Sequence, residues 1–419
     1  MINTQPSCMD LKESGLLSVE QALQQILSGI TVINGTERLN IQQAVKRILA
    51  EAIISPLNVP PQHNSAVDGY ALRAEDLPAH GNTGLFECVG MALAGKPYQG
   101  EIEKNQCIRI MTGAFVPDST DCVVMQEHTE LAGDSLIIAD NHQAGQNIRL
   151  AGEDIQQGEA VLAAGKCLMP ADIGLLASLG IIEITVKRKL RIAIASSGDE
   201  LCPLGESPQL GQIYDSNRYS LLAALQRPDI EVIDLGIIED NPQCLLQTFE
   251  DASTTADVII SSGGVSVGEA DHTKTALQQA GNIDFWKVAI KPGRPLAFGH
   301  IGQSVFFGLP GNPVAVLVTF YHFVLPALAK LLGSERPIAP IIQARCQQEI
   351  RKRAGRTEIQ RGILQQAENG EWTVRTTGKQ GSGILRSMSL ANCFIILEHQ
   401  RERVNVGEWV SVQAFSGVF

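Results

Sequence analysis

Residues 257–274 read DVIISSGGVSVGEADHTK, and this stretch decides how the central part of the chain folds. The apolar, β-branched run at its start is typical of a strand that is buried on both faces of a sheet. Two adjacent glycines end that run, and small hydroxyl side chains, two acids and a lysine follow. Because glycine carries no Cβ, a ligand can approach the backbone closely there. The stretch therefore predicts a buried strand that ends in a binding loop.

Similar strands surround this one. Four more apolar runs alternate with helical or capped segments between residues 187 and 337: LRIAIAS, IEVIDLGI, FWKVAI and VFFGL. Such an alternation predicts an α/β domain whose parallel sheet has helices on both faces. Ligands of open α/β sheets bind beyond the carboxyl ends of the strands. We therefore expect three loops to open on one edge of this sheet: SGDEL at 197–201, SGGVSVGEAD at 262–271 and LPGNPVAV at 309–316.

The flanking segments have a different pattern. Residues 18–30 carry apolar side chains at helical spacing between a serine and a glycine, which predicts a capped helix. Residues 37–54 predict a second amphipathic helix or a strand followed by a helix, and residues 170–181 predict a helix that begins with proline. Short β-like runs between Gly and Pro turns fill the rest. The predicted domains are a linking domain (1–61 and 149–186), a β-rich insertion domain (62–148), the α/β domain (187–337) and a C-terminal β-domain (338–419).

Composition narrows the class of protein. The chain has 419 residues, too many for one ordinary core, and it shows neither a run of 18 apolar residues nor a signal peptide. We therefore expect a cytoplasmic protein without a membrane partner. The net charge of −12 argues against a nucleic-acid partner, which would need basic stripes. The nine cysteines form no CxxC pair and predict free thiols rather than zinc ligands or disulfides.

The three loops share a chemistry that suits phosphate. Asn312 and Pro313 predict the start of a helix, whose free N–H groups form an anion site. The alternative is that all three loops are ordinary strand-to-helix turns, but three of them on one edge favour a phosphate pocket. The residues expected to bind this ligand are Ser262, Gly263, Gly264, Ser266, Pro310, Gly311 and Asn312.

Carboxylates stand beside these loops. Glu200, Asp240 and Asp271 lie at or near predicted strand ends. Carboxylates repel phosphate unless a cation lies between them, and Mg²⁺ takes one or two carboxylates together with phosphate oxygens. The group therefore predicts Mg²⁺ as a cofactor. The alternative is that these acids cap helices or face solvent.

Three cations follow in the segment KVAIKPGRPLAFG, residues 287–299. Lys287 and Lys291 flank a short strand, and Arg294 lies in the turn after it. Cations beside anion-binding loops suit a doubly charged oxyanion or a phosphate, to which arginine adds a two-pronged donor. The alternative is a solvated basic edge.

Seven motifs occur in one order along the chain: NSAVDGYAL at 64–72, RIMTGAFVP at 109–117, SGDEL, YDSNRY, SSGGVSVGEADHTK, KPGRPLAFG and LPGNPVAV. Together they closely resemble molybdopterin molybdenumtransferase, the family that includes the gephyrin E-domain. The resemblance covers nearly the whole chain from about residue 15. One departure is Arg294, where many members have lysine, although the positive charge is kept.

The resemblance implies a function. Members insert molybdate into adenylylated molybdopterin with the help of Mg²⁺, the phosphoanhydride is hydrolysed, AMP leaves and molybdenum cofactor remains. It also implies an elongated homodimer of four-domain subunits, with a three-layer α/β domain that binds molybdopterin, a β-rich insertion domain and a C-terminal domain like a β-barrel. The insertion domain of one subunit is expected to reach the active site of the other. An adenylyltransferase is the expected source of the substrate.

The family's functional residues match positions in this chain. The resemblance implies that Glu200, Asp240 and Asp271 bind the metal, and that Arg361 and Ser382 join Lys291 and Arg294 around molybdate. The residues that it implies for catalysis are Asp68, Thr112, Asp154, Glu200, Asp240, Asp271, Lys287 and Lys291.

Two other functions fit the same resemblance. The fold also serves as a receptor-clustering module, so the chain could be a catalytically inactive scaffold that binds molybdopterin. A molybdopterin adenylyltransferase has a similar α/β domain but is short and would not need the β-domains. Release of AMP from adenylylated molybdopterin separates the three, because the transferase releases AMP, the scaffold does not and the adenylyltransferase consumes ATP instead.

Overall fold

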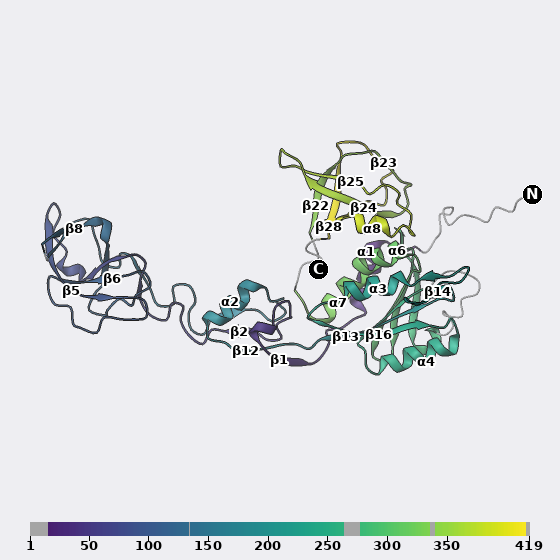
Figure 1. Cartoon of the computed structure of the whole chain (residues 1–419), viewed down its shortest axis with the longest axis horizontal. Helices are drawn as coiled ribbons and strands as arrows, with labels where there is room; N and C mark the ends of the chain where they lie inside the picture. The colour runs from purple at the N-terminus through teal and green to yellow at the C-terminus, as the bar shows by residue number, and fades with distance from the viewer. Residues whose placement is uncertain (1–15, 134, 264–276, 336–339, 416–419) are drawn as a thin grey trace, which may run out of the picture.

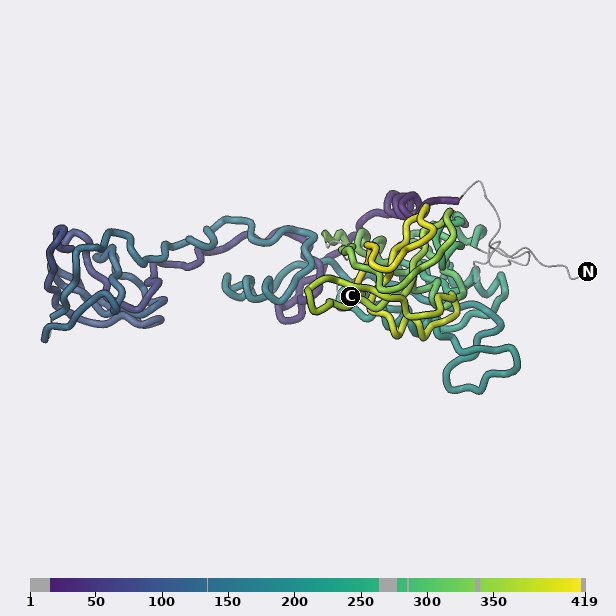
Figure 2. Tube along the Cα trace, turned by 90° about the horizontal axis from the view of Figure 1, so that it is seen from above, coloured from purple at the N-terminus to yellow at the C-terminus, as the bar shows by residue number. Residues whose placement is uncertain are grey.

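The computed structural model of the chain describes residues 16–133, 135–263, 277–335 and 340–415. The molecule is elongated (Figures 1 and 2). A β-rich body, the insertion region (residues 62–148), lies at one end, and the α/β region (residues 187–335) lies at the other with the C-terminal barrel (residues 340–415) beside it. The linking region (residues 36–61 and 149–186) joins the two ends. The expected fold class, an elongated α/β plus β chain, is confirmed, whereas the domain boundaries stay a prediction.

The α/β region is built on a six-stranded sheet with the order β16-β13-β17-β21-β20-β18. The apolar runs of the sequence form the strands, but the expectation of an all-parallel sheet was wrong. β20 runs antiparallel to both of its neighbours, because a short loop joins it to β18 and a two-residue turn joins it to β21. The strands are β13 (Leu190–Ser197), β16 (Ile230–Ile238), β17 (Val258–Ser262), β18 (Asn282–Lys287), β20 (Pro295–Ile301) and β21 (Ser304–Leu309).

Helices cover both faces of this sheet, which makes the region three-layered (Figure 1). One face packs against α4 (Pro242–Ser253) through Leu245 and Phe249. The other face packs against α1 (Val19–Ser28), α3 (Ser216–Ala224) and a long helix formed by α6 (Pro313–Thr319), the π-helical turn η4 (Phe320–Val324) and α7 (Leu325–Leu331). This long helix, Pro313–Leu331, has the length and composition of a membrane span, but 72% of its apolar window is buried inside the fold, as in the core helix of a globular domain.

The C-terminal barrel closes on itself. Its strands follow the order β24-β25-β22-β28-β26, and β26 pairs again with β24. Apolar side chains such as Val374, Ile395 and Val412 fill its interior. The elements are β22 (Ile341–Cys346), β23 (Ile350–Arg351), β24 (Thr357–Gln366), β25 (Trp372–Thr376), α8 (Arg386–Leu390), β26 (Cys393–Leu397), β27 (Arg403–Val404) and β28 (Trp409–Ala414). The expected barrel-like domain is confirmed.

The insertion region is a curled sheet with the order β7-β4-β6-β5-β9-β8. Buried residues on its two faces form two small clusters, one around Phe86 and one around Ile108. The elements are β3 (Asn64–Ser65), β4 (Gly69–Leu72), η2 (Ala74–Asp76), β5 (Thr83–Ala92), β6 (Gln106–Ile110), β7 (Cys122–Met125), η3 (Gln126–His128), β8 (Thr129–Ala132), β9 (Ser135–Ala139) and β10 (Ile148–Arg149).

The linking region corrects one expectation and confirms another. Of the two alternatives for residues 37–54, the amphipathic helix is wrong, because β1 (Thr36–Asn40) pairs along its whole length with β12 (Glu183–Lys187). The strand of the other alternative is present, but only the short 3-10 turn η1 (Ile41–Gln43) follows it in place of the expected helix. This tertiary pairing overrides the helical spacing of the apolar side chains. The expected helix α2 (Pro170–Ser178) does begin with proline. Two short strands complete the region: β2 (Ile53–Ile54) and β11 (Ala160–Leu162).

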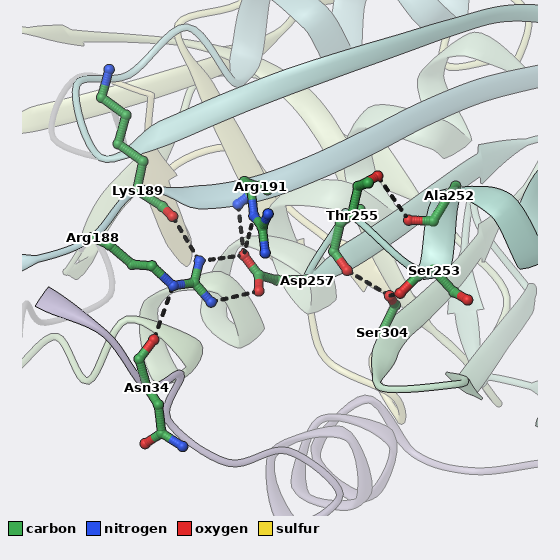
Figure 3. Close-up of polar contacts among 10 residues, drawn as sticks. Asn34, Arg188, Lys189, Arg191, Ala252, Ser253, Thr255, Asp257 and Ser304 are labelled. Atoms are coloured by element: carbon green, nitrogen blue, oxygen red, sulfur yellow. Dashed lines mark hydrogen bonds and ion pairs between the residues drawn. The ribbon is translucent and has the colours of Figure 1, made fainter.

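An ion-pair cluster lies where the chain enters the α/β region, directly after β12 (Figure 3). The guanidinium of Arg188 donates two hydrogen bonds of 2.7 Å to the carboxylate of Asp257, and these bonds raise the pKa of Arg188. The Nε of the same guanidinium donates to the Asn34 carbonyl at 2.9 Å, and the Arg191 N–H donates to Asp257 at 2.8 Å. A two-pronged arginine–carboxylate pair fixes geometry as well as charge, so this cluster holds the chain directly after β12 against the start of β17.

Candidate functional site

The carboxyl ends of four parallel strands meet at one edge of the α/β sheet, here called the sheet edge. Ser197 of β13 pairs with Ile238 of β16, and Ser262 of β17 pairs with both Ser196 and Leu309. The segments that begin at residues 198, 239, 263 and 310 therefore all leave from this edge. The short loop between β18 and β20 leaves from the same edge, because β18 points in the same direction as β21. The sheet edge thus collects most of the predicted site residues of the α/β region.

Gly263 shows why this edge needs glycine. Its φ of +92° lies in the left-handed region, and a Cβ at this position would come within 2.3 Å of the Ser197 carbonyl oxygen. The Gly263 N–H donates to the Leu309 carbonyl at 3.2 Å. The loop thus starts in close contact with the ends of both neighbouring strands. Gly264, Ser266 and Asp271, which were predicted as ligand or metal residues, lie outside the described residues.

Asn217, at the start of α3, ties two of the loops together and was not among the predicted site residues. Its side-chain amide donates to the Ser262 hydroxyl at 3.0 Å and to the Gly311 carbonyl at 2.7 Å. The motif YDSNRY contains this residue and was the signal that could have identified it.

Three buried polar atoms at the sheet edge make no hydrogen bond within the described chain: Ser197 Oγ, Asn217 Oδ1 and Ser261 Oγ. A buried polar atom without a partner costs about 1–3 kcal/mol unless a ligand or a water satisfies it. The edge is therefore suited to a polar ligand.

The start of α6 is shared with the barrel. Asn312 occupies the position before the helix, as predicted, but its side chain makes no capping hydrogen bond. The N–H of Val314 in the first turn donates to the carbonyl of Ser382 at 3.0 Å. The barrel loop that carries Ser382 therefore lies directly against the loop that carries the predicted ligand residues Pro310, Gly311 and Asn312.

Two predicted metal ligands stand at the sheet edge. Glu200 follows β13, Asp240 follows β16, and both are exposed. Among the described residues, no group of three or more His, Cys, Asp or Glu residues is arranged to hold a metal ion. Mg²⁺, however, binds through one or two carboxylates and otherwise through substrate phosphates and water. The donor set on this edge therefore fits Mg²⁺.

The three predicted cations lie in and beside the loop between β18 and β20. Lys287 ends β18, and Arg294 directly precedes β20, with its carbonyl accepting a hydrogen bond of 2.8 Å from Val288 N. Lys291 belongs to the short strand β19 (Ile290–Lys291), which pairs with β24 of the barrel. Its ammonium lies 3.3 Å from the carboxylate of Glu358. Lys291 of this loop thus stands at the junction of the sheet edge and the barrel.

Arg361, predicted as a molybdate residue, is buried in the barrel with 1% of its surface exposed. Its Nε donates to the Ser387 hydroxyl at 3.0 Å and its Nη2 to the Gly381 carbonyl at 3.1 Å. Burial lowers the pKa of Arg361 to about 10, and the negative charge of Glu358 opposes this effect. The guanidinium therefore stays positively charged at neutral pH, next to the loop that carries Ser382.

Asp68 and Thr112 meet in the insertion region. The Thr112 N–H and hydroxyl donate to Asp68 Oδ1 at 2.8 and 2.7 Å. These two bonds hold the pKa of Asp68 below its usual value, so the carboxylate is ionised at neutral pH. The structure thus brings these two predicted residues together. Both views of the chain show the insertion region at the opposite end of the molecule from the sheet edge (Figures 1 and 2).

Asp154 lies where the chain passes between the linking and insertion regions. Its N–H donates to the Val59 carbonyl at 3.0 Å. A cavity of about 420 Å³ opens beside it, lined by Val59, Pro60, Asn64, Arg149, Glu153 and Asp154. Within one chain, Asp154 is therefore also apart from the sheet edge.

Fold and geometry define a class. The chain is a multidomain α/β protein whose open sheet presents a polar and cationic edge, shared with a β-barrel, that suits a phosphorylated or oxyanion ligand.

Comparisons with known proteins give the family. Residues 17–180 match the family model for the MoeA N-terminal region (domain I and II), residues 193–330 match a probable molybdopterin binding domain, and residues 343–415 match the MoeA C-terminal region (domain IV). The chain is 44% identical over 403 residues to the molybdopterin molybdenumtransferase of Haemophilus influenzae, which covers 96% of this chain and 99% of that one. The chain belongs to the molybdopterin molybdenumtransferase family.

Further relatives support this assignment. The molybdopterin molybdenumtransferase of a Nostoc species is 36% identical and covers 90% of this chain and 88% of its own length. The gephyrin of Dictyostelium discoideum is 33% identical and covers 94% of this chain and 61% of its own length. The crystal structure of the molybdopterin biosynthesis MoeA protein from Pyrococcus horikoshii superposes with a TM-score of 0.84 at 31% identity, and covers 96% of this chain and all of that one.

Proposed function

We propose that this chain inserts molybdate into adenylylated molybdopterin and releases AMP, which completes the synthesis of molybdenum cofactor. Relatives with up to 44% identity carry the name of this activity. The observation that carries the proposal for this chain is the sheet edge, which carries unsatisfied polar atoms and touches the barrel both at the start of α6 and at Lys291. These are the groups that a phosphorylated substrate and an oxyanion require.

In this proposal the sheet edge binds the phosphate groups of the substrate. Ser262 supplies a hydroxyl, Gly311 leaves space for close approach, and Gly263 sets the path of its loop. Asn217 holds the loops together through Ser262 and Gly311. The tetrahedral molybdate dianion is held by charge-assisted hydrogen bonds at the junction with the barrel. The residues proposed for that role are Lys291, Arg294, Arg361 and Ser382.

We also propose that Mg²⁺ assists. Glu200, Asp240 and Asp271 would hold the ion, which would act as a Lewis acid and template on the phosphoanhydride. The support is that Glu200 and Asp240 follow neighbouring strands on the sheet edge and are exposed.

The active site is proposed to be completed by a second copy of the chain. Asp68, Thr112 and Asp154 are implied in catalysis, yet they belong to the part of the chain that extends away from the sheet edge (Figures 1 and 2). In a two-fold dimer, the insertion region of one subunit can lie over the sheet edge of its partner. A cytoplasmic location and delivery of the substrate by an adenylyltransferase are part of the same proposal.

One assay tests the function. Purified protein is incubated with adenylylated molybdopterin, and AMP is measured by chromatography with and without molybdate and Mg²⁺. Release of AMP that needs both ions is the expected result. No release would indicate a binding scaffold, and consumption of ATP with bare molybdopterin would indicate an adenylyltransferase. Lys291→Met serves as a matched variant, because it keeps most of the side-chain length and removes only the charge that is proposed to bind molybdate.

A further inference from the structure

The contact between Lys291 and the barrel contains a buried acid that has no assigned role. Glu358, on β24, has only 6% of its surface exposed. One carboxylate oxygen, Oε2, accepts from the Lys291 ammonium at 3.3 Å, and the other, Oε1, accepts from the Gln360 side-chain amide at 2.9 Å. Gln360 is itself buried, with 4% exposed. Gln360 of the barrel therefore holds one oxygen of the carboxylate, and the other oxygen contacts Lys291.

Two further cations feel the charge of Glu358. Burial lowers the pKa of Lys352 and Arg361, and in both cases the negative charge of Glu358 opposes that effect. The charge of Lys291 also acts on Lys352. Glu398 and Glu402 also act on Lys352, whereas Glu358 is the carboxylate that acts on both Lys352 and Arg361 and contacts Lys291. A buried charge is tolerated when it is paired and hydrogen-bonded, and Glu358 meets both conditions.

The backbone fixes the same contact. Lys291 and Glu358 are directly paired in the parallel ladder between β19 and β24, and the N–H of Thr357 donates to the Ala289 carbonyl at 2.8 Å. The end of the Lys291 side chain is different, because 49% of that side chain is exposed. A lysine side chain has four rotatable bonds, so a half-exposed ammonium without a partner samples many positions. Among the residues that the structure describes, the Glu358 carboxylate is the group that contacts this ammonium and restricts it.

We propose that Glu358 is a positioning residue for the oxyanion site: its buried carboxylate holds the Lys291 ammonium at the junction of sheet edge and barrel, ready to donate to a tetrahedral dianion. An ammonium has three donors, so Lys291 can contact the carboxylate and the dianion together. This inference rests on the proposed function, because it takes molybdate as the dianion.

Removal of Glu358 has two opposed effects. The loss of a negative charge favours anion binding, whereas the loss of the anchor frees Lys291, which the incoming anion must then order. Lys291 is half-exposed, so water screens the charge effect. We therefore expect the loss of positioning to be the larger effect.

The first test compares Glu358→Ala with Glu358→Gln. Half-saturating molybdate is measured in the AMP-release assay, and molybdate affinity is measured by calorimetry on the full-length protein. Glu358→Ala should raise both constants about tenfold (about 1.4 kcal/mol) and leave kcat within about twofold. Glu358→Gln keeps an oxygen acceptor at the same distance and should stay within about threefold of the wild type. Unchanged or tighter binding in Glu358→Ala would overturn the proposal.

The second test asks whether Glu358 acts through Lys291. In a Lys291→Ala background, Glu358→Ala should have no further effect on molybdate binding, because the group that it positions is gone. A purely structural role would give the same loss in both backgrounds, and that result would also overturn the proposal. If Glu358→Ala does not fold, the same cycle is run with Glu358→Leu, which fills the buried space and also lacks an acceptor for Lys291.

The matched control is Glu371→Ala. Glu371 forms a surface ion pair with Arg345 at 3.4 Å on the same barrel, outside the proposed site, and its removal should leave molybdate binding unchanged. The proposed function and this inference can fail separately. If wild-type protein shows no molybdate-dependent release of AMP, the proposed function fails. If wild-type protein releases AMP in a molybdate-dependent way, and the Glu358 variants bind molybdate as tightly as the wild type, only this inference fails.

Discussion

The sheet edge and the insertion region carry predicted site residues in opposite settings. At the sheet edge, loops lock together through Gly263 and Asn217, and the barrel docks against them through Lys291, Glu358 and Ser382. In the insertion region, Asp68 and Thr112 form a small exposed pair at the far end of an elongated chain. The sheet edge holds its loops in fixed positions beside the barrel, whereas the insertion region carries its Asp68–Thr112 pair far from that edge.

This difference teaches how the molecule divides its work. A phosphorylated ligand needs converging donors, and the sheet edge converges them within one chain. The insertion-region pair is preformed, because Asp68 is already held by two hydrogen bonds, but within one chain it lies at the opposite end of the molecule from the sheet edge. The distant position of Asp68 is explained if the sheet edge of a second copy of the chain lies against the insertion region.

Gly263→Ala should have the largest effect. The new Cβ would lie 2.3 Å from the Ser197 carbonyl oxygen at a φ of +92°, so the loop must shift or the strand end must open. We expect a loss of about 3 kcal/mol in the free energy of unfolding and the loss of AMP release. Denaturant unfolding and the AMP assay measure the two effects.

Gly311→Ala is the control for that substitution. Gly311 lies on the same edge, but a Cβ there meets no heavy atom within 4 Å. Its stability should stay within about 0.5 kcal/mol of the wild type. Equal stability losses in both variants would mean that the close approach of Gly263 to the Ser197 carbonyl does not determine the stability of the sheet edge.

Asp68→Ala should lower activity about a hundredfold, as expected for a carboxylate that acts on the reacting groups, and should leave thermal unfolding unchanged. Asp140→Ala is the matched control, since Asp140 is another carboxylate of the insertion region whose pKa is lowered by a backbone N–H, that of Gly81. It should retain full activity. Equal activity losses in the two variants would show that the insertion region responds to any lost charge rather than to Asp68.

Acid should lower the free energy of unfolding through His322, which packs between the long helix of the α/β region and the barrel. Burial lowers the pKa of His322 to about 4, its Nδ1 lies 2.9 Å from the Val318 carbonyl, and its ring packs against Phe394 of the barrel at 5.3 Å. The folded state favours the neutral ring. The contribution of His322 to the free energy of unfolding is therefore complete above the usual pKa of 6.5 and is lost as the pH falls toward 4. We expect a loss of about 2 kcal/mol between pH 7 and pH 5 from this group.

His322→Asn removes that titration and keeps an amide that can donate to Val318. Urea unfolding at pH 7 and pH 5 should show a smaller difference in the variant than in the wild type. The same difference in both proteins would mean that other groups cause the acid sensitivity.

Much of the fold could be predicted from the sequence, because its signals are local. Buried strands such as β13, β17 and β21 are continuous apolar runs, and α1 has its serine cap. Two features depended on distant partners. Residues 37–40 form a strand because β12 lies beside them, and β20 runs antiparallel because of its short connections.

In the candidate site too, local features could be predicted and contacts between distant residues could not. Glu200, Lys287 and Arg294 could be placed on one edge, because the ends of parallel strands meet there. The contacts of Asn217 and Glu358 could not be predicted, since each spans 45 or more positions of the chain. The burial of Arg361 likewise depends on the closure of the barrel.

The most direct test of the central claim, an active site shared between two copies of the chain, is complementation in a defined heterodimer. Asp68→Ala and Glu200→Ala chains with different affinity tags are co-expressed, and the mixed dimer is isolated by both tags. Each variant alone should be nearly inactive, whereas the mixed dimer contains one site with both residues intact and should recover about half of the wild-type rate of AMP release. A mixed dimer as inactive as its parents would show that Asp68 and Glu200 must come from the same chain, and would contradict the account.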